Sequence, residues 1–365
     1  MKTIGLLNLK KEYKFLKKSL LPRLEHVMSE GKFILGSELE EFEKKFAKYT
    51  GTKYAVGVSN GTSAIFLALK VLGIGPGDEV ITTAMSFNAT AQAIVYTGAT
   101  PVFVDVDPYT VSIDPSAINK VITSKTKVIL PVHLYGIPAP MKDIMKIAHK
   151  HHLFVVEDCA QAHGTIYNGK KMGTFGDVSA YSFMAAKNLG SYGDAGAVVT
   201  NSKKYADHLK KLRNHGRTTK YVHDELGYAE RMDNLQAVIL LTKLPHLDSW
   251  NNRRRTIAKR YDKELSQTVR TITVPHGSIS NYYTYTISVK KRDRFMKHLA
   301  QMGIKTGIYY PLPLHLQPVF AYLGYKKGDL PVVEKVANEI VSIPVHPFLT
   351  ELDVNRIIKT INAYV

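Results

Sequence analysis

The stretch Tyr54-Ala-Val-Gly-Val58, followed by Ser59-Asn-Gly-Thr-Ser63 and an apolar run from Ala64 to Leu72, shows how the chain is organised. The first run predicts a buried strand, the Gly-Thr-Ser sequence a turn, and the longer run a helix. From here to about residue 200, short apolar strands alternate with helical segments. Such alternation indicates an α/β fold with a mainly parallel central sheet and helices on both faces.

Three segments outside this stretch carry further expectations. Ser37-Glu-Leu-Glu40 has the spacing of a capping box and predicts a helix that ends near Gly51. A helical stretch over Asp233 to Ser266 contains Pro245, which predicts a kink or break near His246. Residues Tyr282 to Ser288 alternate like a half-buried strand. We therefore expect a large domain over residues 1–245 and a smaller C-terminal α/β domain over residues 246–365.

Composition excludes several classes of protein. A single cysteine among 365 residues excludes an intramolecular disulfide framework and fits a reducing cytoplasm. No apolar run is long enough to span a membrane, and the N-terminus lacks a secretory apolar region. The net charge of +18 comes from lysines spread along expected helical faces, without a basic stripe interleaved with aromatics. We therefore expect neither nucleic acid nor a membrane as a partner.

The strand predicted over Phe154 to Asp158 ends in two carboxylates. Ligands of parallel sheets bind outside the carboxyl ends of the strands, which is where Asp158 is expected. A carboxylate there can keep a pyridine nitrogen protonated, although it can also simply cap the next segment. Gln161 follows within Cys159-Ala-Gln161-Ala-His163-Gly164, and its amide could reach a phenolate oxygen.

Lys187 lies in Ala180-Tyr-Ser-Phe-Met-Ala-Ala-Lys187-Asn-Leu-Gly190, among apolar residues. A buried lysine loses its charge readily and supplies an amine for an imine. The turn Gly61-Thr62-Ser63 offers N–H groups and hydroxyls to a phosphate at a helix N-terminus, and Ser182 can add another hydroxyl. Phe87 could stack on a ring or pack in the core. Together these residues can hold pyridoxal 5′-phosphate (PLP).

Two other kinds of site are not supported by the sequence. His149, His151 and His152 match no metal-ligand spacing, so we expect no metal and interpret them as a helix end where cations suit the dipole. Cys159 lies at an apolar strand end among small neighbours, where a buried, inert thiol is expected.

Several ordered stretches resemble the DegT/DnrJ/StrS-type nucleotide-sugar aminotransferases, which are PLP-dependent enzymes of fold type I. The resemblance spans nearly the whole chain and is specific because many motifs occur in the same order. The matching stretches are Gly31–Gly36, Ser59–Ala64, Gly75–Val80, Pro131–Gly136, Glu157–Gly164, Lys187–Gly190, Arg231–Ala237, Pro311–Pro318 and Leu323–Tyr325.

The resemblance implies a cytoplasmic homodimer with shared active sites. Such an enzyme would take an amino group, with glutamate as the expected donor, and pass it to a nucleotide-linked keto sugar. Lys187 and Asp158 would be catalytic. The implied cofactor-binding residues are Gly61, Thr62, Ser63, Phe87, Asp158, Gln161, Ser182, Lys187 and Asn234. The implied substrate-binding residues are Phe33, His163, Arg231, Tyr310 and His315.

Two departures from the family pattern stand out. Met184-Ala185-Ala186 replaces the usual proline and small residue before the lysine, and Ala229 replaces an asparagine that contacts the partner's phosphate. Either Arg231 or Asn234 replaces that lost contact, or nothing does. The loop beginning at Tyr309 favours amination at C3 of the sugar over C4. The alternatives are a C4 aminotransferase, a PLP-dependent sugar dehydratase, or a non-catalytic regulatory or scaffold relative. Products of such enzymes usually feed surface polysaccharides or glycosylated metabolites.

Overall fold

A computed structural model describes residues 3–266 and 269–364 of the chain. Its central sheet has seven strands in the order β1-β9-β8-β5-β4-β2-β3. Strand β9 runs antiparallel to both of its neighbours, and the remaining neighbouring pairs are parallel, as the sequence predicts. The strands are β1 (Tyr54–Val58), β2 (Glu79–Thr83), β3 (Thr100–Val104), β4 (Thr126–Leu130), β5 (Phe154–Asp158), β8 (Val178–Ser182) and β9 (Gly196–Thr200).

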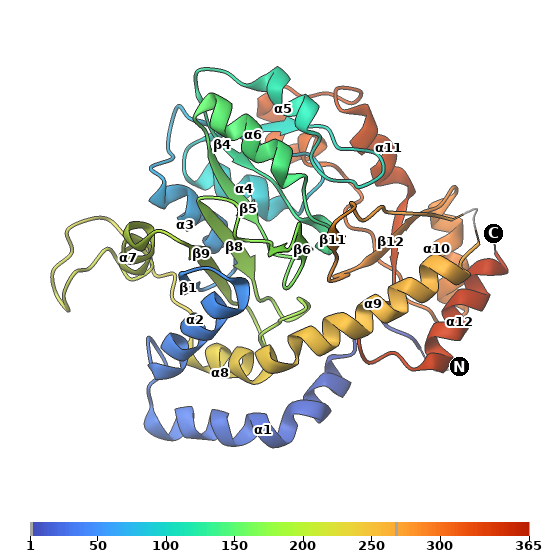
Figure 1. Ribbon diagram of the computed structural model, residues 1–365, viewed down its shortest axis with the longest axis horizontal. Coiled ribbons are helices and arrows are strands. Elements are labelled where there is room, and N and C mark those ends of the chain that lie inside the picture. The colour runs from blue at the N-terminus through green and yellow to red at the C-terminus, as the bar shows by residue number, and fades with distance from the viewer. Residues whose placement is uncertain (1–2, 267–268, 365) are drawn as a thin grey trace.

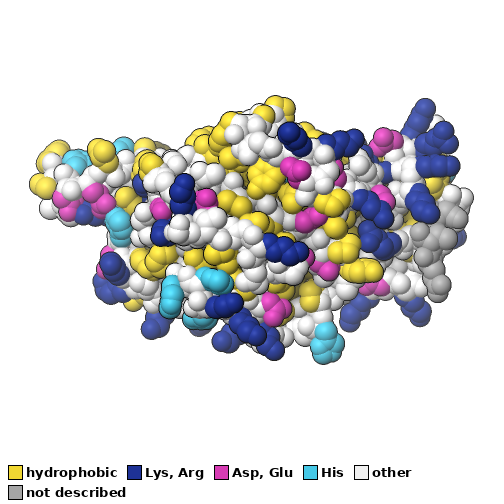
Figure 2. All heavy atoms as spheres, turned by 90° about the horizontal axis from the view of Figure 1, so that it is seen from above, with side chains coloured by type: hydrophobic (Ala, Val, Ile, Leu, Met, Phe, Trp, Pro, Cys, Tyr) yellow, Lys and Arg dark blue, Asp and Glu magenta, His cyan; other side chains and the backbone are white. Residues whose placement is uncertain are grey.

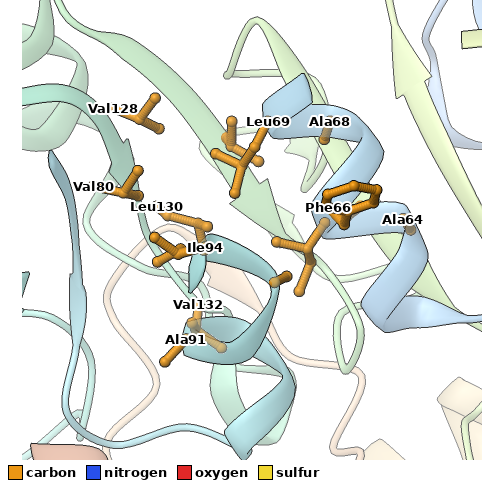
Figure 3. Close-up of a cluster of buried hydrophobic side chains, with 14 of the residues drawn as sticks. Ala64, Phe66, Ala68, Leu69, Val80, Ala91, Ile94, Val128, Leu130 and Val132 are labelled. Atoms are coloured by element: carbon orange, nitrogen blue, oxygen red, sulfur yellow. The ribbon is translucent and has the colours of Figure 1, made fainter. Parts of the chain in front are cut away.

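Helices cover both faces of this sheet (Figure 1). The period of two along each strand divides its side chains between two cores. Val80, Val128 and Leu130 face the core under helices α3 and α4, which Figure 3 shows, whereas Ile81 and Ile129 face the opposite core. The helices of the large sheet are α2 (Ser37–Thr50), α3 (Gly61–Val71), α4 (Asn88–Tyr96), α5 (Pro115–Val121), α6 (Met141–His151), α7 (Lys203–Leu212) and α8 (Asn234–Lys243).

A separate core joins the C-terminal segments. It packs α9 (Leu247–Glu264), α10 (Arg292–Gln301) and α12 (Glu351–Asn362) against a small sheet, and Ile4 joins it from the N-terminal segment. That sheet has the order β10 (Arg270–Thr271), β12 (Tyr285–Ser288) and β13 (Ile340–Ile343). A third sheet joins β11 (Ser278–Ile279) to β6 (Ile166–Tyr167) and β7 (Lys170–Lys171). Helix α11 (Pro331–Glu339) instead packs on the core of α3 and α4.

The predicted break near His246 is confirmed. Helix α8 ends at Lys243, a 3₁₀ turn spans Leu244–His246, and α9 starts at Leu247. Pro245 lies inside that turn, where its missing N–H and its ring are tolerated. Short 3₁₀ turns also occur at Leu134–Gly136, Leu314–Leu316 and Pro318–Leu323.

Two local predictions are wrong in detail. Helix α2 does begin at Ser37, but Gly36 is its N-cap and the Ser37 hydroxyl bonds to Glu38, so no capping box forms. The strand expected over Tyr282 to Ser288 is only β12, and all four of its residues are buried. The reason is that both faces of β12 are covered: Tyr285 and Ile287 enter the C-terminal core, and Thr286 pairs with Ser342 at 2.7 Å on the other side.

The N-terminal helix α1 (Leu9–Glu30) lies along α8 on the outside of the molecule (Figure 1). The segment between α7 and α8, residues 213–233, reaches away from the body on the left of the same view. Figure 2 shows lysine and arginine side chains scattered over one face between hydrophobic patches. Among the described residues, no helix combines the length and apolar character that crossing a membrane requires.

Candidate active site

A cavity of about 640 Å³ opens at the carboxyl edge of the parallel strands. Strands β5 and β8 end there at Asp158 and Ser182, and helix α3 begins there at Gly61. Parallel strands place their carboxyl ends at one edge of the sheet, so residues far apart in the sequence meet at this edge. Of the predicted residues, the cavity is lined by Gly61, Thr62, Ser63, Phe87, Asp158, Gln161, Ser182, Lys187 and Tyr310.

Asp158 is buried at the base of this cavity. Its Oδ1 accepts the N–H of Ala160 at 3.0 Å, and its Oδ2 accepts the hydroxyl of Thr90 at 2.8 Å. Burial raises the pKa of Asp158, whereas these two donors and the nearby charge of Lys187 act in the opposite direction. The carboxylate is therefore held in one orientation, with hydrogen-bond donors that favour its charged form.

Lys187 is half-buried at the same end of the cavity, and its Nζ lies 4.7 Å from the centre of the Tyr283 ring. Burial lowers the pKa of Lys187 to about 8, and the charge of Asp158 opposes part of that shift. A lysine with this pKa has a substantial neutral fraction near pH 8. It can therefore act as a nucleophilic amine or as a base.

Gln161 links the base of the cavity to its aromatic wall. Its Oε1 accepts the N–H of Tyr135 at 2.7 Å, and its Nε2 donates to the Tyr310 hydroxyl at 3.3 Å. Phe87, which is 58% exposed, lies opposite, with its ring centre 5.6 Å from that of Tyr310. A flat ring between Phe87 and the floor of the cavity would thus meet an aromatic face and an amide N–H.

The N-terminus of α3 forms the other end of the cavity. Asn60 caps this helix, its Oδ1 accepting the N–H of Ser63 at 2.9 Å. The first-turn N–H groups of Gly61 and Thr62 have no partner within the helix, so they are suited to an anion. A Cβ on Gly61 would lie 2.5 Å from the Ser182 Cβ, so only glycine lets the helix approach the strand end this closely. Backbone donors and the Ser182 hydroxyl thus fit a phosphate group.

Glu230 also lines this end, and its Oε2 accepts a hydrogen bond from the Ser59 hydroxyl. Among the described residues, the cavity lining carries three carboxylates, Asp158, Asp194 and Glu230, and one cation, Lys187. The chain's overall charge of +18 is therefore not concentrated in this cavity.

Five predicted residues lie outside the cavity of their own chain. The Asn234 side chain bonds to Lys32, Glu38 and Leu39, and Arg231 bonds to Asn214 and His215. Phe33 is 44% exposed on the surface beside Gly36. His315 is buried beside Glu334, and His163 is buried against Tyr181 and Phe183.

The sequence could not show that the side chains of His163 and His315 are buried. Burial lowers the pKa of His163 to about 3, so its ring is neutral at pH 7. A motif gives the type of residue but not the side of the loop that faces the cavity. The roles of all five residues in binding stay predictions.

Sequence reasoning missed Thr90, Glu230 and Tyr283, which line the cavity, and Ser59, which bonds to Glu230. Thr90 had a usable signal, because it follows Phe87 by three residues in a helix that starts at the same edge of the sheet. Glu230 had none, since it is 171 residues from the serine it contacts.

The neighbouring polar residues of β5 have structural partners. Glu157 accepts N–H groups from Gly173, Phe175 and Gly176 and pairs with His133 at 3.0 Å. Burial raises the pKa of Cys159 well above its usual value, so its thiol stays protonated, as expected for a buried, inert residue.

A second cavity, of about 680 Å³, lies beside α2. Its lining includes the buried ion pair of Arg213 and Glu43. That pair satisfies both charges. The N-terminus of α2 borders this space at Gly36, but none of the residues predicted to hold the cofactor lines it. The chemistry is therefore concentrated in the first cavity.

Comparisons with known proteins agree with this geometry. A model of the DegT/DnrJ/EryC1/StrS aminotransferase family matches residues 15–362. A pleiotropic regulatory protein of Geobacillus stearothermophilus is 46% identical over 99% of this chain and 98% of its own length. A UDP-N-acetyl-3-dehydro-alpha-D-glucosamine 3-aminotransferase of Acidithiobacillus ferrooxidans is 42% identical over 98% of this chain and 97% of its own.

Solved structures give the same result. DesV of S. venezuelae, crystallised with a ketimine intermediate, is 40% identical, with a TM-score of 0.98 over 100% of this chain and 99% of its own. Other similar structures are described as containing the cofactor pyridoxamine phosphate or as a PLP form.

Proposed function

The chain belongs to the DegT/DnrJ/EryC1/StrS aminotransferase family, whose members depend on PLP, and we propose that it converts a nucleotide-linked keto sugar to the amino sugar. The observation that carries this proposal is the half-buried Lys187 beside the oriented carboxylate of Asp158, at the carboxyl edge of the sheet. When bound, PLP supplies an electron sink and a carrier for the amino group.

The ring end of the cavity supplies the proton chemistry. Lys187 Nζ accepts a proton from the α-carbon of the amino donor and later returns one to the carbon that becomes the aminated sugar carbon. Asp158, held by Thr90 and the Ala160 N–H, keeps its charge directed at the pyridine nitrogen. The amide N–H of Gln161 would hold the phenolic oxygen, and Phe87 would cover one face of the ring.

The phosphate end anchors the cofactor. Gly61 and Thr62 offer first-turn N–H groups, and Ser182 a hydroxyl, to the phosphate. Because Ala229 has no side-chain amide, the partner's copy of this position adds no side-chain hydrogen bond there. We place the active site at the interface of a homodimer, which would bring the partner's projecting 213–233 segment near this end. Light scattering that found only a monomer in the active enzyme would exclude the shared site.

The sugar is proposed to carry its keto group at C3, and glutamate is the proposed amino donor. Support for C3 comes from the name of the Acidithiobacillus relative, which places the new amino group at that carbon. A cytoplasmic location and a role in polysaccharide biosynthesis belong to the same proposal. Product NMR that located the amine at C4 would correct the position while leaving the transamination intact.

The regulatory alternative rests on the name of the Geobacillus relative and on Ala229. The dehydratase alternative is disfavoured because the dehydratases on this scaffold replace the lysine with histidine. Catalysis is favoured because the lysine, the carboxylate and the glycine at the helix start are all brought into one cavity.

The experiment that tests the proposal is the absorption spectrum of the PLP-reconstituted protein before and after addition of glutamate. We expect the band of lysine-bound PLP to be replaced by the pyridoxamine spectrum. The Lys187→Ala variant should show neither the band nor the change, and its rate of transamination should fall at least ~10³-fold. A wild-type protein that binds no PLP would favour the regulatory alternative. An absorption band that does not change when glutamate is added would exclude glutamate as the donor.

A further inference from the structure

The backbone around Glu230 is fixed by a paired segment. The Glu230 N–H donates to the Arg213 carbonyl at 2.9 Å, and the Tyr228 N–H donates to the Leu212 carbonyl at 2.7 Å. Arg213 is itself buried, and its guanidinium bonds to Glu43 and to the Gly57 carbonyl. Glu230 thus projects from a backbone that is tied to β1, rather than from the free part of the projecting segment.

The Glu230 carboxylate lies at the start of α3. It accepts a hydrogen bond from the Ser59 hydroxyl, whose alternative acceptor is Ser63 Oγ, 3.1 Å away. The Asn60 side-chain amide donates to the same Ser59 oxygen at 3.1 Å. A hydroxyl has one proton, so Ser59 cannot give it to Glu230 and to a bound anion together. In this arrangement the Glu230 carboxylate occupies the Ser59 hydroxyl, a donor close in sequence to the N–H groups suited to phosphate.

Among the described residues of this chain that line the cavity, none near the helix start offsets this negative charge. The cation of the lining, Lys187, is coupled to Asp158 at the ring end. A phosphate at Gly61 and Thr62 would therefore lie near a second anion in a partly buried setting, where like charges repel more strongly than in water. The helix N-terminus attracts both anions, so the carboxylate and the phosphate compete for the same partial positive charge.

We propose that Glu230 weakens the hold on the phosphate and so sets how readily the cofactor dissociates. This inference rests on the proposed function only in taking PLP as the ligand. Glu230 acts on cofactor retention through the phosphate and has no part in the proton chemistry at Lys187. The negative charge of Glu230 at the phosphate end therefore limits the affinity for PLP.

The test uses Glu230→Gln, which keeps the shape, removes the charge and adds an N–H donor. The dissociation constant of PLP from the full-length protein is measured by absorption titration, in parallel with phosphate-free pyridoxal. We expect Glu230→Gln to bind PLP about tenfold more tightly, which is ~1.4 kcal/mol, and pyridoxal as the wild type does. Glu230→Ala should likewise bind PLP more tightly and leave the pyridoxal constant unchanged, since it also removes the charge.

A matched control is Asp293→Asn, which removes one carboxylate from an exposed position, 86% accessible, on α10. It should leave both dissociation constants unchanged. Inorganic phosphate serves as a second probe: its ability to raise the melting temperature of the cofactor-free protein should be greater in Glu230→Gln than in the wild type. This readout does not require Lys187 to react.

Equal PLP affinity in wild type and Glu230→Gln, or weaker binding in the variant, would overturn the inference. Tighter binding of PLP and pyridoxal alike would also overturn it, because the effect would then not act through the phosphate. A failure of the proposed function would be seen separately, as normal PLP binding without transfer of an amino group.

Discussion

The two ends of the active-site cavity differ in how completely one chain builds them. At the ring end, Asp158 and Gln161 each have partners at hydrogen-bond distance, and Lys187 lies against Tyr283. At the phosphate end, the donors are first-turn N–H groups, and the Glu230 carboxylate bonds to Ser59, which precedes that turn. In the proposed function the ring end carries the chemistry, and in the proposed role of Glu230 the phosphate end limits the affinity for the cofactor.

Among the substitutions that test this difference between the ring end and the phosphate end, Asp158→Asn should have the largest effect, and the effect should be on kcat. The amide has the same shape but cannot carry the charge that keeps the pyridine nitrogen protonated, so kcat should fall about 10²-fold. The dissociation constant of PLP should change much less. Steady-state kinetics and absorption titration separate the two quantities. If kcat survived and affinity collapsed, the division of labour between the two ends would be wrong.

The pH dependence of cofactor attachment should report on the ring end alone. Burial lowers the pKa of Lys187 to about 8, so the amine is protonated below that pH and becomes nucleophilic above it. The rate at which the absorption band forms on cofactor-free protein should rise about tenfold from pH 7 to pH 9. Stopped-flow measurements with PLP and with pyridoxal should show the same rise in rate between pH 7 and pH 9. A rise seen with PLP only would mean that the titrating group is the phosphate rather than Lys187.

Gly61→Ala should have a smaller effect, at the phosphate end alone. The added Cβ would meet the Ser182 Cβ at 2.5 Å and push the helix start away from the strand. We expect about fivefold weaker PLP binding, ~1 kcal/mol, with pyridoxal binding preserved. Gly75→Ala is the control, because its Cβ would meet only the Thr97 carbonyl, at 3.9 Å. Equal losses for PLP and pyridoxal would show that the substitution disturbs the whole site.

The sequence predicted the parts of the site that follow from strand and helix ends. The α/β fold, and the joining of Asp158, Ser182 and Gly61 in one cavity, follow from alternating elements and from the edge rule for parallel sheets. These relations are local in sequence, or depend only on strand direction. They therefore survive without knowledge of tertiary packing.

The rest of the site depends on tertiary contacts. Thr90 and Asp158 are 68 residues apart, and Ser59 and Glu230 are 171 apart, so no local pattern joins them. His163 and His315 are expected to bind substrate, and the packing of their loops buries both side chains in this chain, so their roles stay predictions. Residue type was visible in the sequence, whereas orientation was set by packing.

The central claim is that this chain transfers an amino group to a nucleotide-linked keto sugar. The most direct measurement is to incubate the PLP-loaded enzyme with ¹⁵N-labelled glutamate and nucleotide-linked 3-keto hexoses and to follow the label by mass spectrometry. The account predicts ¹⁵N in an amino sugar that is still attached to its nucleotide, and no transfer with Lys187→Ala. Label that leaves glutamate and never reaches any keto-sugar nucleotide would contradict it.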